Sequence, residues 1–326
     1  MRFFWPAILA SLMAPTAIAA EQPATTPFRS CINLGNALEA PAEGAWGYTV
    51  RARDLATIRS GGFDAVRLPV AVTNYLGPAP DYRLDPRLLQ RVDEILTWAE
   101  RERLIVLLDL HHVERIHDQP ARETPRVVAI WRQLAEHYKA RPESLYFEII
   151  NEPHGRLGGQ LLVDFYAAVL PTIRATNPTR KIVVSGDRWG SIQGLDALTG
   201  LDPTNLIATF HYYDPFEFTH QGLWWGAFAP PLGAKWGGRQ AYAKVDADMA
   251  SAAAQARALG MPLLLGEFGV LRTVKTAQRA SWTAAVRRSA ERHAIAWCSW
   301  DFAGAFPAYD LTHERWIEPI LDALKR

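Results

Sequence analysis

Two glutamates stand where a pair of carboxylates could perform acid–base chemistry. Glu152 lies between Asn151 and Pro153, and Glu267 follows Gly266, each directly after an apolar run. Most glutamates are solvated loop residues. Here each glutamate follows an apolar run and has neighbours with special backbone preferences, which favours a fixed position for its side chain. Two carboxylates that face each other across a cleft can cleave a glycosidic bond, because one protonates the leaving oxygen while the other attacks or stabilises the anomeric carbon.

The segments around these glutamates alternate between short apolar runs and longer amphipathic stretches. Runs that are apolar on both faces and separated by helices are typical of a parallel sheet covered on both sides. Eight such units in 326 residues predict a single-domain α/β fold, the (β/α)8 or TIM barrel. An open doubly wound sheet is less favoured, because no G-x-G-x-x-G turn follows the first run. The expected strands are residues 30–34, 65–69, 104–110, 145–150, 181–185, 206–210, 262–266 and 294–300, with helices near 50–60, 86–102, 123–140, 160–176, 191–199, 240–259, 274–292 and 314–325.

A barrel of this kind places its chemistry at the carboxyl ends of its strands. Polar and aromatic residues recur at those ends, and the two glutamates, on the fourth and seventh strands, would face each other across the barrel mouth. The residues at the strand ends are Asn33 and Asn36, Arg67, His111 and His112, Asn151 and Glu152, Trp189, His211 and Tyr213, Glu267, and Trp300.

Residues 1–20 have the form of a cleaved secretory signal, which leaves residues 21–326 as the catalytic domain. Arg2 is followed by an apolar run and then, at residues 17–19, by the small-x-small pattern that a signal peptidase recognises. An uncleaved membrane anchor is the alternative, but two prolines interrupt a segment that is short for a membrane span. We therefore expect export to the periplasm or beyond, with no membrane contact after cleavage.

The charge balance excludes strongly charged partners. The chain has 35 Lys and Arg against 34 Asp and Glu, a formal net charge of +1. Such a balance cannot build the field that nucleic-acid binding requires. We expect a monomer whose partner is a neutral substrate.

Cys31 and Cys298 lie near opposite ends of the mature sequence, each in an apolar, strand-like segment. The favoured interpretation is two buried free thiols, because unpaired cysteine packs like a small hydrophobic residue. Export would also permit a disulfide. Closure of a barrel makes the first and last strands neighbours, so the two cysteines could approach each other.

The motifs at the strand ends resemble those of glycoside hydrolase family 5, in the cellulase-like part of clan A. They run in the family's order from about residue 29 to the C-terminus, and the combination of Asn-Glu-Pro with Gly-Glu-Phe-Gly is specific. The resembling segments are Ile32–Pro41 (INLGNALEAP), Val66–Pro69 (VRLP), Leu108–His112 (LDLHH), Phe147–His154 (FEIINEPH), His211–Gly222 (HYYDPFEFTHQG), Gly266–Gly269 (GEFG) and Trp300–Phe302 (WDF).

The resemblance implies a retaining mechanism without a cofactor, in which Glu152 is the acid/base and Glu267 the nucleophile. Retention requires carboxyl groups roughly 5 to 5.5 Å apart, whereas inversion needs a wider gap. Arg67 would keep Glu267 ionised by lowering its pKa, would form a structural ion pair with Glu148, or would do both.

Further residues receive roles from the same resemblance. Asn151 would donate a hydrogen bond to the sugar 2-hydroxyl beside the cleaved bond. Tyr213 would hydrogen-bond the nucleophile, and His211 would orient the acid/base. The contact of Asn151 would tighten as the transition state forms, which is where it would contribute to catalysis.

His111 and His112 are adjacent, so only one can point into a barrel mouth. Alternation along the third strand favours His111 as the sugar contact, with His112 behind it or at the rim. A metal site built from His111, His112, Glu114 and His117 is the competing interpretation, but no H-E-x-x-H helix is present, and we expect no metal.

The 12 tryptophans separate by position. Those within expected helices are Trp98, Trp131, Trp282 and Trp316, for which packing against the barrel is the simpler role. Those in loops or at strand ends are Trp46, Trp189, Trp224, Trp225, Trp236 and Trp300, whose faces could stack on pyranose rings. Trp300 resembles the family's platform for the sugar that bears the anomeric carbon. Phe216, His220 and Asn36 are further candidates for substrate contact.

The sequence therefore predicts a retaining endo-β-1,4-glucanase that hydrolyses β-glucan as polysaccharide or oligosaccharide. An endo-β-1,4-mannanase or a mixed-linkage β-glucanase would use the same catalytic set. A non-catalytic glycan-binding barrel is the alternative of a different class, and the presence of both carboxylates argues against it. A secreted esterase or peptidase is disfavoured because no G-x-S-x-G motif is present.

Overall fold

The computed structural model describes Met1 and residues 26–226 and 228–325. The signal predicted for residues 1–20 lies, apart from Met1, outside these residues. Among the helices that are described, none is long and apolar enough to cross a bilayer.

Eight parallel strands close into one barrel in chain order, with β1 paired to both β2 and β8. Their bounds are β1 Ser30–Asn33, β2 Ala65–Val70, β3 Ile105–Leu110, β4 Leu145–Glu148, β5 Ile182–Ser185, β6 Leu206–His211, β7 Leu263–Phe268 and β8 Ala296–Ser299. The predicted single-domain (β/α)8 fold is confirmed.

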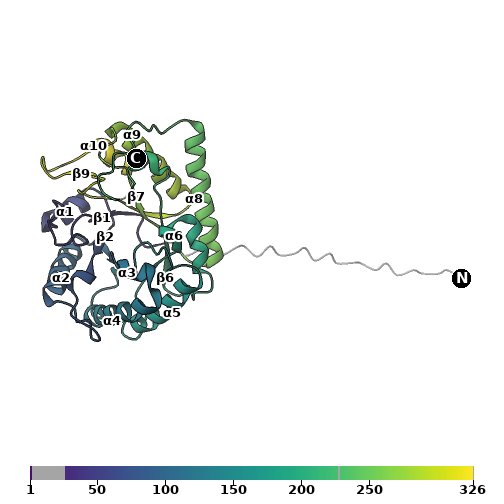
Figure 1. The fold of residues 1–326 in the computed structure, drawn as a ribbon. Helices are drawn as coiled ribbons and strands as arrows, with labels where there is room; N and C mark the ends of the chain where they lie inside the picture. The colour runs from purple at the N-terminus through teal and green to yellow at the C-terminus, as the bar shows by residue number, and fades with distance from the viewer. Residues whose placement is uncertain (2–25, 227, 326) are drawn as a thin grey trace.

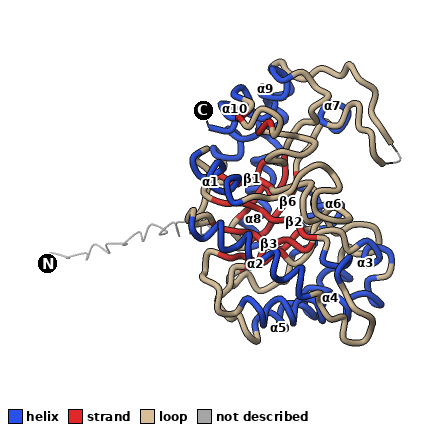
Figure 2. Tube along the Cα trace, turned by 90° about the vertical axis from the view of Figure 1, so that its left-hand side faces the viewer, coloured by secondary structure: helices blue, strands red, loops and turns tan. Residues whose placement is uncertain are grey.

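Helices surround the barrel and bury its outer face (Figure 1). The long helices are α1 Ala52–Ser60, α2 Pro86–Arg101, α4 Pro120–Tyr138, α5 Gln160–Arg174, α8 Arg239–Leu259, α9 Thr276–Arg292 and α10 Glu318–Lys325. Short segments complete the connections: η1 Val72–Tyr75, α3 Glu114–Asp118, α6 Asp187–Gly190, η2 Ile192–Leu198, α7 Phe216–Thr219, β9 Tyr309–Asp310 and β10 Arg315–Trp316. Of these, α3, α6 and α7 gather on one side, at the carboxyl ends of the strands (Figure 2).

The interior of the barrel changes from apolar to polar along its axis. Alternate strand residues point inward, and the lower layer is a separate apolar cluster that includes Cys31, Ala65, Leu107, Tyr146, Val183, Ile207, Leu264 and Cys298. Two residues further along the strands stand the buried polar residues Asn33, Arg67, Asp109, Glu148, Ser185 and Thr209. The strands thus seal the barrel below and present polar groups toward its mouth.

A register shift decides how Glu267 is presented. Leu265 pairs with Phe210, but His211 pairs with Glu267, so Gly266 is an extra residue on β7. Such a bulge changes the direction of the side chain that follows it. A Cβ atom at position 266 would lie 2.6 Å from Thr209 Oγ1, so the bulge fits only glycine.

Two of the predicted helices differ from the structure. Residues 191–199 contain the 3-10 helix η2 instead of an α-helix, and α10 begins only at Glu318. Pro319 explains the second difference, because proline is tolerated only in the first turn of a helix. Trp316, assigned from the sequence to a helix, lies in β10 and packs on Phe63 and Phe302.

The prediction of two free thiols is wrong, because Cys31 and Cys298 form a disulfide. The two residues are direct partners in the parallel ladder between β1 and β8, with Cα atoms 4.1 Å apart. Both side chains are fully buried in the lower layer. Barrel closure brought them together, as their positions on the first and last strands allowed.

We expect loss of this disulfide to lower the free energy of unfolding by about 2–4 kcal/mol, because it closes a loop that spans most of the chain. The double variant Cys31→Ala/Cys298→Ala and the reduced wild type should melt at the same lower temperature in calorimetry. The reductant should not change the melting temperature of the double variant. Equal melting temperatures for oxidised and fully reduced wild type, with the thiols titrated, would contradict this expectation.

Candidate active site

Arg67 is the centre of the polar layer. Its side chain has no exposed surface, yet it contacts three carboxylates. Nε and Nη2 donate to Glu148 at 2.7 and 2.9 Å, Nη1 donates to Glu267 Oε1 at 2.7 Å, and Nη2 lies 3.0 Å from Asp109 Oδ2. The contact with Glu267 and the structural ion pair with Glu148, both considered from the sequence, are therefore both present.

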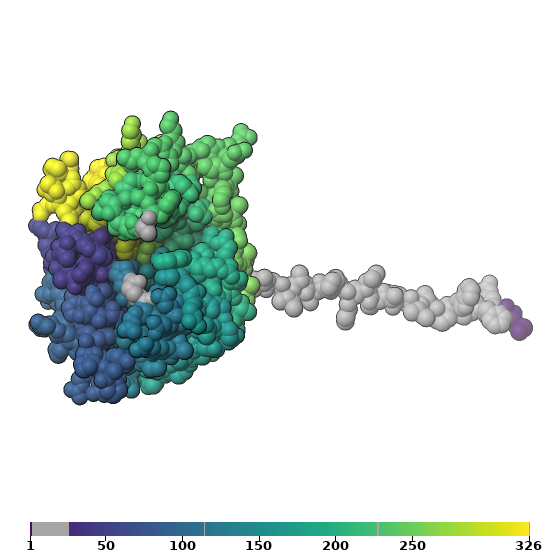
Figure 3. All heavy atoms as spheres, viewed as in Figure 1, coloured from purple at the N-terminus to yellow at the C-terminus, as the bar shows by residue number. Residues whose placement is uncertain are grey.

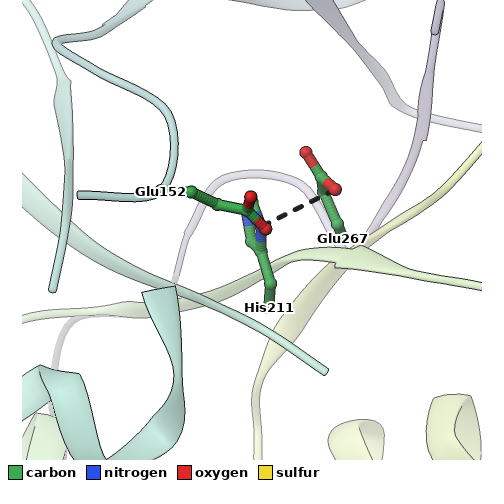
Figure 4. Close-up of side chains that lie close together, drawn as sticks. All are labelled: Glu152, His211 and Glu267. Carbon is green, nitrogen blue, oxygen red and sulfur yellow. Dashed lines mark hydrogen bonds and ion pairs between the residues drawn. The ribbon is translucent and has the colours of Figure 1, made fainter. Parts of the chain in front are cut away.

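The carboxyl groups of Glu152 and Glu267 point toward each other (Figure 4). An oxygen of each, together with a ring nitrogen of His211, lies within a group whose atoms are all within 4.8 Å of one another. This separation matches the roughly 5 to 5.5 Å of retaining glycosidases and is shorter than the roughly 6.5 to 9.5 Å of inverting ones. The geometry therefore favours direct attack by one carboxylate over activation of a water between them.

His211 and Tyr213 hold the two carboxylates in place. His211 Nδ1 lies 2.8 Å from Glu152 Oε1 and 3.6 Å from Glu267 Oε2. The phenol of Tyr213 donates to Glu267 Oε2 at 2.9 Å. Burial lowers the pKa of His211, so its ring is neutral near pH 7, and Nδ1–H then serves as the hydrogen-bond donor to Glu152. Both contacts are those expected from the sequence.

The two carboxyls differ in their electrostatic surroundings. Burial raises the pKa of Glu152 to about 7, which keeps a proton available for a leaving group. Burial also raises the pKa of Glu267, while His211, Arg67 and the hydrogen bond from Tyr213 oppose that rise. The expectation that Arg67 lowers the pKa of Glu267 is therefore wrong, because burial raises this pKa by more than the guanidinium lowers it.

Asn151 and His111 lie next to each other and contact the polar layer. Asn151 Oδ1 accepts from Arg67 Nη2 at 2.8 Å, and its Nδ2 lies 3.4 Å from His111 Nε2. His111 is buried, and its Nδ1 lies 2.5 Å from Asp109 Oδ2. His112 is exposed, with a φ of 48°, and lies edge-on to Trp46. The alternation predicted for the two histidines, one in the mouth and one at the rim, is found.

Two histidines of the competing metal hypothesis, His111 and His117, contact other side chains. His117 stacks on His154, with ring centroids 3.7 Å apart, while His111 is paired with Asp109. Among the side chains that the structure describes, which do not include that of Glu114, the one group of histidine, cysteine and acidic residues with the spacing for an ion is Glu152, His211 and Glu267.

Trp300 lies beside His111. The two rings are nearly parallel, with centroids 5.8 Å apart. Gly269 is required here, because a Cβ atom at that position would lie 2.0 Å from the carbonyl oxygen of Trp300. Asn36 Oδ1 accepts from the backbone N–H of Ala305 at 3.2 Å and so fastens the first loop to the loop that follows Trp300.

The long connection between β6 and α8 forms one wall of the mouth and projects from this face in Figure 2. Phe306 packs on Tyr213 and on Trp225, which links the hydrogen-bond donor of Glu267 to the outer wall. Trp224 and Trp225 are 54% and 44% exposed. Figure 3 views this face and shows it hollowed between the green surface of this wall and the blue and teal surface of the β3 and β4 connections.

The other aromatic candidates separate into packed and exposed residues. Phe216 stacks on His220 at 4.1 Å, and His220 packs against Tyr213 and Phe306. Trp236 is partly buried and packs on Phe218 and Tyr242 inside the wall. Its predicted sugar contact stays a prediction.

Two rim tryptophans retain large exposed faces. Trp46, in the β1 to α1 connection, is 47% exposed, and Trp189, in α6, is 59% exposed. They stand on the connections after β1 and β5 and so border the mouth from two separate segments. Exposed indoles at the rim of a polar cleft are suited to stacking on pyranose rings.

Glu39 and Asp109 are among the buried acids to which the sequence assigned no role. Glu39 is 2% exposed, and its carboxylate accepts hydrogen bonds from the backbone N–H groups of Asn36 and Ala37. Burial raises the pKa of Glu39 to about 8 and that of Asp109 to about 6. Both acids interrupt apolar runs in the sequence, and this interruption is the signal that could have identified them.

The sequence model of the cellulase family, glycosyl hydrolase family 5, matches residues 31–305. The chain belongs to glycosyl hydrolase family 5. The predicted resemblance is thus confirmed.

Relatives within the family are named as endoglucanases. Endoglucanase H of Acetivibrio thermocellus is 32% identical over 278 residues, which cover 85% of this chain and 30% of that protein. This chain thus spans about a third of the length of the first curated relatives that it matches.

Solved structures of this family match over nearly the whole described chain. The Thermotoga maritima Cel5A structure in complex with cellobiose is 34% identical with a TM-score of 0.89, covering 91% of this chain and 97% of that one. The cellulose synthase subunit Z of Clostridioides difficile is 31% identical with a TM-score of 0.88, covering 92% and 100%.

We expect kcat/KM on cello-oligosaccharides to fall as pH rises through about 7, because Glu152 must be protonated to act as the acid and its pKa is about 7. The rate should fall tenfold per pH unit above that value. The variant Glu152→Gln should lose this alkaline limb together with most of its activity. An alkaline limb of unchanged position in Glu152→Gln would show that another group sets it.

We expect Arg67→Met to lower the free energy of unfolding by about 3–5 kcal/mol at pH 8, because it leaves Asp109, Glu148 and Glu267 buried without their cation. The loss should shrink at pH 5, because buried carboxyls with raised pKa values take up protons in the folded state as pH falls. Urea unfolding at both pH values measures this. Arg83→Met, at an exposed arginine paired only with Asp81, is the matched control and should change little.

Proposed function

We propose that this chain is a retaining endo-β-1,4-glucanase, in which Glu267 is the nucleophile and Glu152 the acid/base. The observation that carries the proposal is the pair of carboxylates on opposite sides of the mouth, with oxygens within 4.8 Å of each other. Membership of glycosyl hydrolase family 5 supports the same chemistry.

In the first step Glu267 attacks the anomeric carbon while Glu152 gives its proton to the leaving oxygen, so the glycosidic bond breaks as a glycosyl ester forms. In the second step Glu152, now a carboxylate, takes a proton from water, which displaces Glu267 and restores both groups. Arg67 and Tyr213 each hold one oxygen of Glu267 and orient it for attack. Asn151, fixed by Arg67, presents its amide N–H to the sugar 2-hydroxyl.

The exposed aromatic faces suit a chain of sugars bound along an open groove. Trp300 would carry the sugar that bears the anomeric carbon, and Trp46, Trp189, Trp224 and Trp225 would provide outer platforms. An open cleft favours attack within a chain over attack at its end. The near-zero net charge is compatible with a neutral polysaccharide.

A mannan-cleaving activity is the second candidate. The same Thermotoga maritima Cel5A has a structure in complex with mannotriose. Glucose and mannose differ in the orientation of the 2-hydroxyl, the group that Asn151 would contact. We propose glucan as the preferred substrate and mannan or mixed-linkage glucan as the alternative.

We further propose export to the periplasm or beyond. The buried disulfide supports it, because such bonds persist in oxidising compartments. The signal-like composition of residues 1–20 points the same way. The likeness to the cellulose synthase subunit Z also supports a role in trimming the cell's own glucan.

We expect the wild type to hydrolyse soluble cellulose derivative faster than lichenan, mannan or laminarin, and Glu267→Ala to lose on the order of 10⁴-fold or more of that activity. Reducing-sugar release measures the rates, loss of viscosity identifies endo action, and proton NMR of the first product gives its anomer. Activity that survives Glu267→Ala, or an inverted product, would overturn the mechanism. Mannan turnover without glucan turnover would move the substrate to the alternative.

A further inference from the structure

His154 stands two residues beyond the acid/base, and neither the sequence motifs nor the mechanism above assigns it a role. Its Nδ1 lies 2.7 Å from the carbonyl oxygen of Glu152. A carbonyl oxygen can only accept, so Nδ1 must carry the proton and donate it. The ring therefore fastens the backbone of the residue whose side chain delivers the catalytic proton.

The backbone of Glu152 needs such a fastening. Its φ is 43°, in the left-handed region that a residue with a Cβ atom enters only at an energetic cost. This conformation aims the carboxyl at His211 and Glu267. Without a restraint, the peptide would relax toward the ordinary region and carry the carboxyl away from the leaving oxygen.

His154 is itself immobilised between two other rings. His117, from α3, stacks on one side with centroids 3.7 Å apart and an interplanar angle of 19°. Trp189, from α6, stacks with centroids 3.4 Å apart and an angle of 8°. The three rings join the connections that follow β3, β4 and β5.

Backbone contacts hold the two outer rings in this stack. Arg156 N–H donates to the carbonyl oxygen of His117 at 2.7 Å, and Trp189 N–H donates to that of Pro153 at 3.0 Å. Trp189 also has a left-handed φ, of 62°, as does Arg188 before it. Glu152 and Trp189, which both contact His154, thus both have a strained backbone. Such conformations persist only where the surrounding contacts hold them in place.

The charge state of the stack is compatible with this role. His117 is 6% exposed, and its Nδ1 accepts from the backbone N–H of His154 at 3.4 Å, which places its own proton on Nε2. Burial, and then the charge of His154, lowers the pKa of His117 to about 4. His117 is therefore neutral near pH 7 and does not repel its neighbour.

We propose that His154 is a positioning residue for Glu152: clamped between His117 and Trp189, it donates its Nδ1–H to the Glu152 carbonyl and so fixes the acid/base carboxyl for proton delivery. This rests on the proposed function of Glu152. The outer face of Trp189 remains exposed, so a sugar on the leaving-group side that stacks there would press on the same three rings.

Two substitutions separate the hydrogen bond from the stack. His154→Phe keeps an aromatic ring between His117 and Trp189 but has no N–H for the carbonyl. His154→Asn places an amide N–H near the position of Nδ1 but removes the ring. If the hydrogen bond is the essential element, the Asn variant retains most activity and the Phe variant does not.

The readout is the dependence of kcat/KM on the leaving group. Cellotetraose needs protonation of its leaving oxygen, whereas 2,4-dinitrophenyl β-cellobioside does not. We expect His154→Phe to lose about 10- to 100-fold on cellotetraose and less than about threefold on the dinitrophenyl substrate. His154→Asn should remain within about threefold of wild type on both. Added azide should restore kcat of His154→Phe on the dinitrophenyl substrate, because this anion needs no general base.

Controls separate folding from positioning. Labelling with 2,4-dinitrophenyl 2-deoxy-2-fluoro-β-cellobioside counts the molecules with a competent Glu267, and rates are expressed per labelled site. His313→Phe, at a 63% exposed histidine paired with Asp310, is the matched control and should match wild type.

The outcomes distinguish this proposal from the one it rests on. Glu152→Ala should show the same leaving-group dependence, more strongly than His154→Phe. If Glu152→Ala shows none, the acid/base assignment fails. A different result overturns the proposal. If Glu152→Ala shows the leaving-group dependence but His154→Phe loses activity equally on both substrates, or loses none on either, then His154 is only a packing residue.

Discussion

Arg67 sits with no exposed surface between Asp109, Glu148 and Glu267, and the remaining polar residues of the mouth are arranged around its guanidinium. Only arginine offers five N–H donors in a rigid planar fork, which here contact all three carboxylates and donate to Asn33 and Asn151 as well. Burying three carboxyls beside one cation leaves an excess of acceptors. The raised pKa values of Asp109 and Glu148 follow from that excess and from burial.

Several residues at the same end of the barrel have strained backbone conformations, as do Arg103, Asn205 and Ala294 before the strands at the other end. Left-handed φ values occur at Asn36, His112, Glu152 and Trp189, all just beyond the carboxyl end of a strand. Such conformations persist only where neighbouring contacts compensate them. Here the compensation comes from stacked rings, from backbone hydrogen bonds between adjacent connections, and from the packing of the barrel beneath.

The apolar lower layer provides that foundation. It is sealed by side chains from every strand, and the Cys31–Cys298 disulfide joins the two strands at which the chain closes on itself. The rigid lower layer therefore supports an upper layer in which several groups are strained, buried or both. The barrel thus separates the part that stabilises the fold from the part that performs the chemistry.

Much of this molecule could be predicted from its sequence because the relevant signals are local. Apolar runs separated by amphipathic stretches identified the strands, the fold and the ends where Glu152 and Glu267 stand. The predicted helix start was wrong at α10, which begins later because of Pro319. The predicted helix type was wrong at η2, because the sequence pattern alone did not distinguish a 3-10 helix from an α-helix.

Only the tertiary structure decided how these residues meet. The pairing of Cys31 with Cys298 depends on barrel closure between strands separated by 267 residues. The bulge at Gly266 sets the direction of Glu267, and burial reverses the pKa change that Arg67 alone would cause. The stack of His117, His154 and Trp189 joins three connections. The sequence determined which residues reach the barrel mouth, because strand periodicity is local. Their contacts, strain and proton affinities depend on neighbours that folding brings together, and no local sequence pattern contains that information.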